Sequence, residues 1–232
     1  MNIAIILSGG VGSRMKADIP KQYIEIYNHP IIYYCLETFL KPEDIDAIVI
    51  VVADVWQTFV EAMVKTLQPS KSIWYAPAGE TRQYSIFNGL KESEKHGVKD
   101  NDIVIIHDAA RPLVSQELIH SCLHGCEEFD GVLPVIPVKD TIYQSSDGVH
   151  IDCLLKRSEL FAGQAPEAFR FGKYLKIHQD MAREELLKIN GSTEIAYKGK
   201  MSVKLIRGDE MNFKITTPED LSNFKSIIAK TK

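Results

Sequence analysis

The chain has 232 residues, of which 45% are hydrophobic and 25% charged, and its formal net charge is −4 at pH 7. This composition excludes collagen-like and disordered chains, and the net negative charge argues against a protein that coats nucleic acid through its overall charge. No apolar run approaches the about 20 residues of a membrane span, and the N-terminus has no basic region followed by a cleavage site. We therefore expect a cytoplasmic protein that binds neither nucleic acid nor a membrane, with a single domain over residues 1–232.

Apolar runs alternate with amphipathic segments through the first 135 residues. The runs that predict strands, most of them continuously apolar as in a sheet buried on both faces, are 3–7, 45–52, 73–76, 102–106 and 131–135. Helical spacing occupies 30–39, 56–67, 82–95 and the segment that opens at Ser115, the expected N-cap. This alternation predicts a three-layer α/β fold around a doubly wound, mostly parallel sheet. Ligands of such sheets bind at the carboxyl ends of the strands.

Residues 138–157 interrupt the alternation. Two short β-like runs flank Ser145–Gly148, and an Asp-Gly pair between alternating segments is a hairpin signal. A hairpin inserted in an α/β domain has little core of its own, so we expect a projecting β-arm used for dimerisation. Beyond the arm, the pattern predicts a helix over 171–187, a strand over 203–206, and a last helix that opens at Pro218. Thr217 is the expected N-cap of that last helix, with Asp220 three residues later.

A glycine-rich segment, SGGVGSRM, follows the first predicted strand directly. Glycines let the backbone turn tightly, and the N–H groups of such a turn form a concave donor site for phosphate. The segment is neither a dinucleotide-binding fingerprint nor a P-loop, because the further glycine and the Gly-Lys-Ser/Thr triplet are absent. Arg14 and Lys21 follow and would concentrate positive charge beside the turn. The alternatives are a tight turn without a ligand and a solvated basic patch.

Two later segments carry further charged side chains. The sequence HDAARP follows the strand 102–106, so Asp108 lies at the rim of the sheet, where an acid can coordinate Mg²⁺ or hold a hydroxyl. A helix-capping aspartate is the alternative. Lys214 lies in an alternating strand-like segment, between Phe213 and Ile215, and would point to the face opposite both. Both a site lysine and an ordinary outward-facing lysine fit that pattern.

A series of motifs occurs in a defined order: LSGGVGSRM, PKQY, GETRQYSIFNGL, HDAARP, PVKDTI, the region of Arg157, and NFKITTPEDL. Together they resemble the methylerythritol-phosphate and ribitol-phosphate cytidylyltransferase family, from Ile3 to about Leu221. The resemblance implies a Rossmann-like fold of the nucleotide-diphospho-sugar transferase type. It also implies a homodimer with exchanged β-arms, CTP as the donor, a polyol phosphate as the acceptor, and Mg²⁺ as the cofactor.

The resemblance also implies a reaction, in which an acceptor phosphate oxygen attacks the α-phosphorus of CTP and pyrophosphate leaves. Such a transfer requires positioning and charge neutralisation more than a dedicated base. The residues implied around the reacting phosphates are Arg14, Lys21 and Lys214. Those implied at the nucleotide are Ser8, Gly9, Gly10, Val11, Gly12, Gly79, Ser85, Asp108 and Ala109. Those implied at the acceptor are Arg111, Thr141 and Arg157, with Asp108 as the metal ligand.

Two neighbours of Asp108 have alternative interpretations. Arg111 could pair with Asp108 in a purely structural role. His107 is expected to be a buried, hydrogen-bonded histidine and not a catalytic base, because the acceptor phosphate is already an anionic nucleophile.

Two departures from the family pattern lie on the acceptor side. Ala165 stands where family members carry threonine in Gln-Thr-Pro, and residues 190–194 replace a Thr-Asp-Glu or Thr-Asp-Ala segment. The lead acceptor is 2-C-methyl-D-erythritol 4-phosphate, for isoprenoid precursor synthesis. The alternative is D-ribitol 5-phosphate or another polyol phosphate, for a cell-surface polysaccharide. A sugar-1-phosphate nucleotidyltransferase using another nucleotide and a non-catalytic nucleotide-binding protein are the remaining hypotheses.

Overall fold

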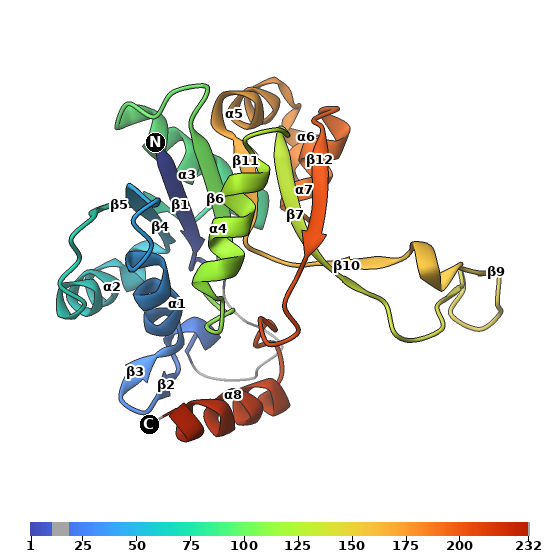
Figure 1. The fold of residues 1–232 in the computed structure, drawn as a ribbon, viewed down its shortest axis with the longest axis horizontal. Coiled ribbons are helices and arrows are strands. Elements are labelled where there is room, and N and C mark those ends of the chain that lie inside the picture. Colours follow the sequence, from blue (N-terminus) through green and yellow to red (C-terminus); the bar gives the residue numbers. More distant parts are fainter. Residues whose placement is uncertain (11–18, 232) are drawn as a thin grey trace.

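The structure, a computed structural model, describes residues 1–10 and 19–231, and a mixed sheet runs through its centre (Figure 1). The strands are β1 (Asn2–Leu7), β2 (Glu25–Ile26), β3 (His29–Pro30), β4 (Ala47–Val52), β5 (Ser72–Pro77), β6 (Ile103–Asp108), β7 (Gly131–Pro137), β8 (Tyr143–Gln144), β9 (Cys153–Leu154), β10 (Phe161–Gly163), β11 (Glu167–Arg170) and β12 (Val203–Arg207). The helices are α1 (Ile31–Leu40), α2 (Asp54–Thr66), α3 (Arg82–Lys95), α4 (Gln116–Gly125), α5 (Phe171–Asp180), α6 (Arg183–Leu186), α7 (Ser192–Lys198) and α8 (Pro218–Thr231), with 3₁₀ turns at Lys21–Tyr23 and Arg157–Glu159.

The central sheet has the order β10-β7-β11-β6-β1-β4-β5, and β12 pairs with the other edge of β7. Strands β5, β4, β1 and β6 are mutually parallel, whereas β11 is antiparallel to both β6 and β7. The prediction of a doubly wound, mostly parallel sheet is confirmed. The sequence pattern missed β10 and β11, because both are very short and Pro166 interrupts the chain between them.

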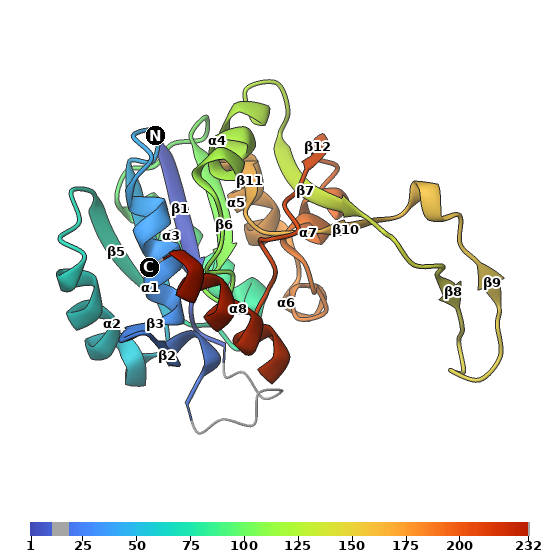
Figure 2. The same cartoon turned by 60° about the horizontal axis from the view of Figure 1, so that its bottom comes forward.

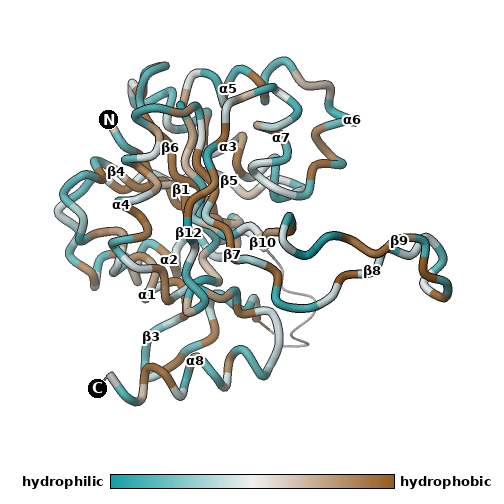
Figure 3. The backbone as a smooth tube through the Cα atoms, turned by 45° about the vertical axis from the view of Figure 1, so that its right-hand side comes forward, coloured by the Kyte–Doolittle hydropathy of each residue, from teal (hydrophilic) through white to brown (hydrophobic). Residues whose placement is uncertain are grey.

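Two helical layers cover the sheet, as the apolar runs predicted. In β1, Ala4 and Ile6 pack into the core under α1, α2 and α4, while Ile3 and Ile5 pack into the core under α3, α5 and α7. The same alternation holds for β4 and β6, so each strand is apolar at nearly every position. Figure 3 shows these hydrophobic strands in the interior, with the polar segments outside.

Helix α8 closes a third, smaller core at the rim of the sheet. Its Phe224 packs with Ile26, Ile31 and Ile215. The predicted N-cap is confirmed, since the Asp220 N–H donates to Thr217 Oγ1 at 3.2 Å and the Thr217 N–H donates to Asp220 Oδ2 at 2.8 Å. Among the described residues, no helix combines the length and the apolar character needed to cross a membrane.

The predicted helix over 171–187 is wrong in its extent. Helix α5 ends at Asp180, and Met181 and Ala182 take extended backbone conformations before α6 begins at Arg183. Helix α7 follows in a segment for which the pattern predicted no element. The strand-like interpretation of the segment around Lys214 is also wrong, because residues 212–216 form no strand.

The segment between β7 and β10 projects from the body as an arm (Figure 2). Strands β8 and β9 pair through Tyr143 with Leu154 and Gln144 with Cys153. The predicted hairpin is confirmed, and its loop covers residues 145–152, a wider span than the expected Ser145–Gly148. Asp147 Oδ1 holds this loop open by accepting from the backbone N–H groups of Val149 and His150, both at 2.8 Å.

Candidate active site

The topology of the sheet defines where a ligand crevice should lie. Strands β1, β4 and β5 follow one another across the sheet in one direction. The next strand along the chain, β6, pairs with the opposite edge of β1. The carboxyl ends of β1 and β6 therefore flank the switch point of the sheet, the usual ligand position in open α/β sheets. Leu7 pairs with Asp108 across these two strands, so the start of the glycine-rich segment and the HDAARP segment lie side by side.

Asp108 is the centre of a cluster of cations at this switch point. Arg82 Nε lies 3.2 Å from Asp108 Oδ1, and Lys214 Nζ lies 2.9 Å from Asp108 Oδ2. Arg111 Nε lies 3.9 Å from Asp108 Oδ2. The Asp108 side chain is only 12% exposed. One carboxylate thus faces three cationic side chains, which leaves an excess of positive charge at the rim, although the whole chain is negative.

The charge state of Asp108 follows from this cluster. Burial raises the pKa of the Asp108 carboxyl, but the opposing effect of Arg82, Lys214 and Arg111 is larger and holds the pKa well below its usual range. The carboxylate is therefore ionised throughout the pH range of interest. Lys214 reaches it from a loop whose next residue, Ile215, is buried and donates its N–H to Ala110 O at 2.9 Å.

The first residues of the glycine-rich segment are held by the 3₁₀ turn that follows it. Gln22 Nε2 donates to Ser8 O at 2.6 Å and to Gly10 O at 2.8 Å. The Ser8 hydroxyl is buried and lies 2.7 Å from the Tyr23 hydroxyl. The Ser8 side chain is thus engaged inside the protein, where it positions the loop. Gln22 is a contributor that the sequence analysis did not single out.

Gly9 permits the loop after β1 to approach the turn after β5, and Gly79 permits that turn to pack tightly against the start of α3. A Cβ atom on Gly9 would lie 2.4 Å from the Cβ of Ala78, and one on Gly79 would lie 2.4 Å from the Cβ of Tyr84. Ser85 Oγ accepts from the Gly79 N–H at 2.9 Å. The loop after β1 and the turn after β5 are therefore in contact through Gly9 and Ala78.

Lys21 and Ala109 also lie at the switch point. Lys21 Nζ donates to Ile215 O at 2.6 Å, which joins it to the loop that carries Lys214. Ala109 is buried, and its N–H donates to Leu7 O at 3.0 Å. Three other expected site residues lie outside the described residues, namely Val11, Gly12 and Arg14.

Arg111 takes the structural pairing that the sequence left as an alternative. Its Nη1 donates to Asn212 O at 2.7 Å, so it braces the start of the Lys214 loop, and its Nε faces Asp108. Asn212 in turn donates from Nδ2 to Ala165 O at 2.6 Å. His107 is fully buried, and its Nε2 donates to Arg111 O at 3.0 Å. The expectation of a buried, hydrogen-bonded histidine is confirmed.

Thr141 and Arg157 are not brought to the cluster within one chain. Both are exposed on the projecting arm (Figure 2), and Arg157 Nη1 donates to Lys139 O at 3.0 Å near the base of the arm. The expected acceptor residues therefore divide into Arg111, which lies beside Asp108, and an arm pair, which does not.

Sequence reasoning missed Arg82 and the acidic residue that faces it. Arg82 is the first residue of α3, within the motif GETRQYS, and its place at a strand–helix turn on the same rim was an available signal. Glu167 lies on β11, where its Oε1 is 3.6 Å from Arg82 Nη2. No pattern in the sequence placed Glu167 here, because its position depends on the insertion of β11 between β6 and β7.

The described residues do not by themselves form a resident magnesium site. Both oxygens of Asp108 are engaged by cations, and no group of three or more His, Cys, Asp or Glu side chains in this part of the chain could hold a metal ion. Mg²⁺ prefers octahedral oxygen coordination, often through one or two carboxylates together with substrate phosphates. An ion here would therefore need the phosphate oxygens of a bound nucleotide.

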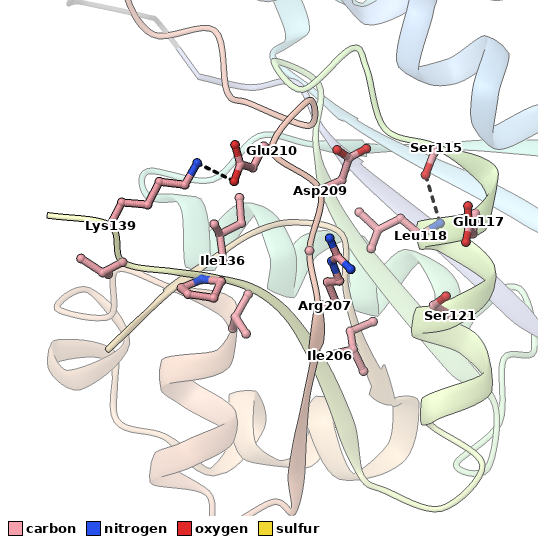
Figure 4. Close-up of a pocket in the computed structure, with 14 residues that line it drawn as sticks. Ser115, Glu117, Leu118, Ser121, Ile136, Lys139, Ile206, Arg207, Asp209 and Glu210 are labelled. Atoms are coloured by element: carbon pink, nitrogen blue, oxygen red, sulfur yellow. Dashed lines mark hydrogen bonds and ion pairs between the residues drawn. The ribbon is translucent and has the colours of Figure 1, made fainter. Parts of the chain in front are cut away.

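The structure also has a separate hollow of about 1030 Å³ (Figure 4). Its walls come from the start of α4, the end of β7 and the end of β12. Lys139 and Glu210 form an ion pair at 2.6 Å across its edge, at the base of the arm. None of the expected site residues that the structure describes lines this hollow, so it is distinct from the Asp108 cluster.

Comparison with known proteins gives a consistent result along the whole chain. The family model for IspD, 2-C-methyl-D-erythritol 4-phosphate cytidylyltransferase, matches residues 2–230. A ribitol-5-phosphate cytidylyltransferase of Vibrio parahaemolyticus is 34% identical over 229 residues, which cover 98% of this chain and 96% of that protein. A 2-C-methyl-D-erythritol 4-phosphate cytidylyltransferase of Geobacillus thermodenitrificans is 33% identical, covering 97% of this chain and 96% of that protein.

Solved structures show the same likeness in three dimensions. The 2-C-methyl-D-erythritol 4-phosphate cytidylyltransferase of Francisella tularensis superposes with a TM-score of 0.78 at 26% identity, covering 97% of this chain and 99% of that one. The 4-diphosphocytidyl-2C-methyl-D-erythritol synthase of Anaerococcus prevotii has a TM-score of 0.82 at 24% identity, covering 98% and 96% respectively, which supports the fold.

The two buried histidines predict how stability depends on pH. Burial lowers the pKa of both His107 and His178 to about 4, whereas an unfolded histidine has a pKa of about 6.5. Below pH 6.5 the unfolded state binds more protons than the folded state, so stability falls as the pH drops towards 4. We expect the free energy of unfolding to fall by about 2 kcal/mol for each histidine by pH 4.5. Urea unfolding between pH 4.5 and 7.5 measures it.

The variant His178→Gln should remove about half of the decrease in unfolding free energy that the two histidines cause between pH 7.5 and 4.5. His124→Gln, at an exposed position, should not change that decrease. An identical slope in wild type and His178→Gln would contradict the assignment.

Proposed function

Since the chain belongs to the family of 2-C-methyl-D-erythritol 4-phosphate cytidylyltransferases, it is a cytidylyltransferase, and we propose that its acceptor is 2-C-methyl-D-erythritol 4-phosphate. CTP and a polyol phosphate are the substrates that the family implies. The family model over residues 2–230 supports this choice of acceptor, and the cluster of Arg82, Lys214 and Arg111 on Asp108, at the switch point of the sheet, supports a transfer between phosphates.

The proposed reaction makes and breaks one bond to phosphorus. An oxygen of the acceptor phosphate attacks the α-phosphorus of CTP, and the bond from that phosphorus to the bridging oxygen of the β-phosphate breaks, so that pyrophosphate leaves. The nucleophile is already anionic and needs no base, which agrees with a neutral His107. Positive charge around the reacting phosphates stabilises the transition state. We assign this role to Lys21 and Lys214, together with Arg14.

The nucleotide side is assigned to the two turns that approach each other. The backbone of Gly9 and Gly10, with Val11 and Gly12, would hold the triphosphate, while Gly79 and Ser85 would contact the cytosine and ribose. The tight approach of these turns supports the assignment, because backbone donors can then face a flat base without intervening side chains. Asp108 and Ala109 are also assigned to the nucleotide side of the site.

Magnesium is proposed as a partner of the nucleotide and not as a resident ion. Mg²⁺ would arrive with CTP and neutralise phosphate charge, with Asp108 as its one protein carboxylate. Because Arg82 and Lys214 engage both oxygens of Asp108, the ion would have to displace one of these cations to bind the carboxylate, and we therefore propose that it binds only together with the nucleotide.

A homodimer with exchanged arms is proposed for the complete acceptor site. The arm exposes apolar side chains that a single chain leaves unpacked, namely Ile142, Tyr143, Val149, Ile151 and Leu154. A second copy would cover such surface. The exchange would also bring Thr141 and Arg157 to a site on the other copy, which they do not reach within one chain. A cytoplasmic location stays a prediction.

D-Ribitol 5-phosphate is the second candidate acceptor. Ala165 is buried next to Asn212 and offers no hydroxyl at a position where the family usually has one. In addition, the Vibrio parahaemolyticus relative carries the ribitol-5-phosphate name at 34% identity. Both observations concern the acceptor and leave the cytidylyl transfer unchanged.

An acceptor panel tests the proposal. We expect pyrophosphate release when the protein is incubated with CTP, Mg²⁺ and 2-C-methyl-D-erythritol 4-phosphate, and a lower kcat/KM with D-ribitol 5-phosphate. Replacing CTP by UTP, GTP or ATP should abolish most of the release. A higher kcat/KM with D-ribitol 5-phosphate would reassign the acceptor. Binding of CTP without turnover of any polyol phosphate would instead favour a non-catalytic nucleotide-binding protein.

Removing one cation tests the electrostatic assignment. Lys214→Ala should lower kcat by about 100-fold or more, because an electrostatic contact to the transition state is lost. Lys204→Ala is the matched control, since Lys204 is exposed on β12, and it should retain the wild-type rate. A wild-type rate in a folded Lys214→Ala protein would remove Lys214 from the reacting phosphates.

A further inference from the structure

Arg82 joins three elements of the fold through its guanidinium. Its Nε lies 3.2 Å from Asp108 Oδ1 at the end of β6, and its Nη1 donates to Ser192 Oγ at 2.6 Å at the start of α7. Its Nη2 lies 3.6 Å from Glu167 Oε1 on β11. Three nitrogens of one planar group thus face three separate partners, so the orientation of Arg82 depends on all three.

Glu167 is a second buried carboxylate of this network, beside Asp108. Its side chain is 9% exposed, and its Oε2 accepts from the Thr193 N–H at 2.8 Å and from Thr193 Oγ1 at 2.6 Å. The carboxylate therefore ties the start of α7 to β11 with one oxygen and faces Arg82 with the other. Burying a carboxylate is costly unless cations and hydrogen-bond donors compensate it, and Arg82 and Thr193 provide both.

The rest of the packing holds Ser192 and Thr193 in place around this carboxylate. The Tyr174 hydroxyl donates to Ser192 O at 3.1 Å, and Tyr174 stacks on Phe169 of β11 with ring centroids 4.1 Å apart. The start of α7 thus has two separate connections to β11, one through aromatic packing and one through Glu167. The second connection also reaches Arg82 and, through it, Asp108.

We propose that Glu167 is a positioning residue, which orients Arg82 against Asp108 and fixes the start of α7 as the acceptor-side wall of the site. This inference rests on the proposed function. Glu167 touches no reacting atom in this account and acts only through Arg82 and Thr193. Strand β11 pairs with the edge of β6 opposite to β1, so Glu167 lies across β6 from the glycine-rich loop, and we assign this side of the site to the acceptor.

The test is a graded series at Glu167. Glutamine has a single acceptor oxygen, so Glu167→Gln keeps the contact to Thr193 or to Arg82 but not both. Glu167→Leu removes both. We expect the KM for the polyol phosphate to rise about threefold in Glu167→Gln and about tenfold in Glu167→Leu, the latter a loss of about 1.4 kcal/mol. The KM for CTP should rise less than the KM for the acceptor, because Lys214 still holds the other oxygen of Asp108.

Thr193 supplies the second arm of the test. Thr193→Val removes the hydroxyl that Glu167 accepts from and should raise the acceptor KM in the same direction as Glu167→Gln, whereas Thr193→Ser should restore the wild-type value. Glu184→Gln and Glu184→Leu are the matched controls, since Glu184 is exposed on α6, and they should leave both KM values unchanged.

Each outcome separates this inference from the function on which it rests. If the wild type turns over a polyol phosphate while the Glu167 variants keep wild-type KM values, the positioning role is overturned and the function stands. Equal increases in the KM for CTP and for the acceptor would also overturn it, because they indicate a general structural role. If the wild type turns over no polyol phosphate at all, the proposed function fails first and the acceptor-side role with it.

Discussion

The pairing of one buried carboxylate with several cations organises this molecule. Asp108 ends β6 beside β1, and Arg82 and Lys214 approach its two oxygens from α3 and from the loop before α8. Without Asp108 these cations would repel one another at a partly buried rim. Without the cations the carboxylate would be a buried, uncompensated charge, which is strongly destabilising. The arrangement holds cations ready at the place where a triphosphate would need them.

The net charge of the chain obscures this local arrangement. A charge of −4 argues against a polyanion partner but says nothing about a rim where three cations share one carboxylate. The acidic side chains that outweigh the cations lie largely on exposed helices and loops, in pairs such as Lys176 with Asp180 and Lys95 with Glu92. Such exposed pairs contribute little to stability and do not alter the site.

The parts of the fold that the sequence predicted are those fixed by local patterns. Strands β1, β4 and β6 are buried on both faces, so their apolar runs identify them, and Ser115 and Thr217 begin their helices as caps. Strand β11 has only four residues, EAFR, and is a strand because two neighbouring strands pair with it. No local pattern of β-strand type encodes that dependence.

The residues of the site also divide into those that a local sequence pattern predicts and those that only the assembled fold brings together. Asp108 was predictable because it ends an apolar strand, and the glycine-rich loop because it follows one. The contact between Lys214 and Asp108 joins residues 106 positions apart, and its loop has no regular structure, so spacing could not reveal it. Arg82 carried a local signal within its motif, whereas Glu167 and Thr193 meet only after β11 enters the sheet.

The most direct measurement of the central claim is the steady-state kinetics of Asp108→Asn, which preserves the shape of the side chain and removes its charge. If Asp108 positions the cations for the reaction, kcat should fall by about 100-fold or more. A folded Asp108→Asn protein with the wild-type kcat would contradict the account.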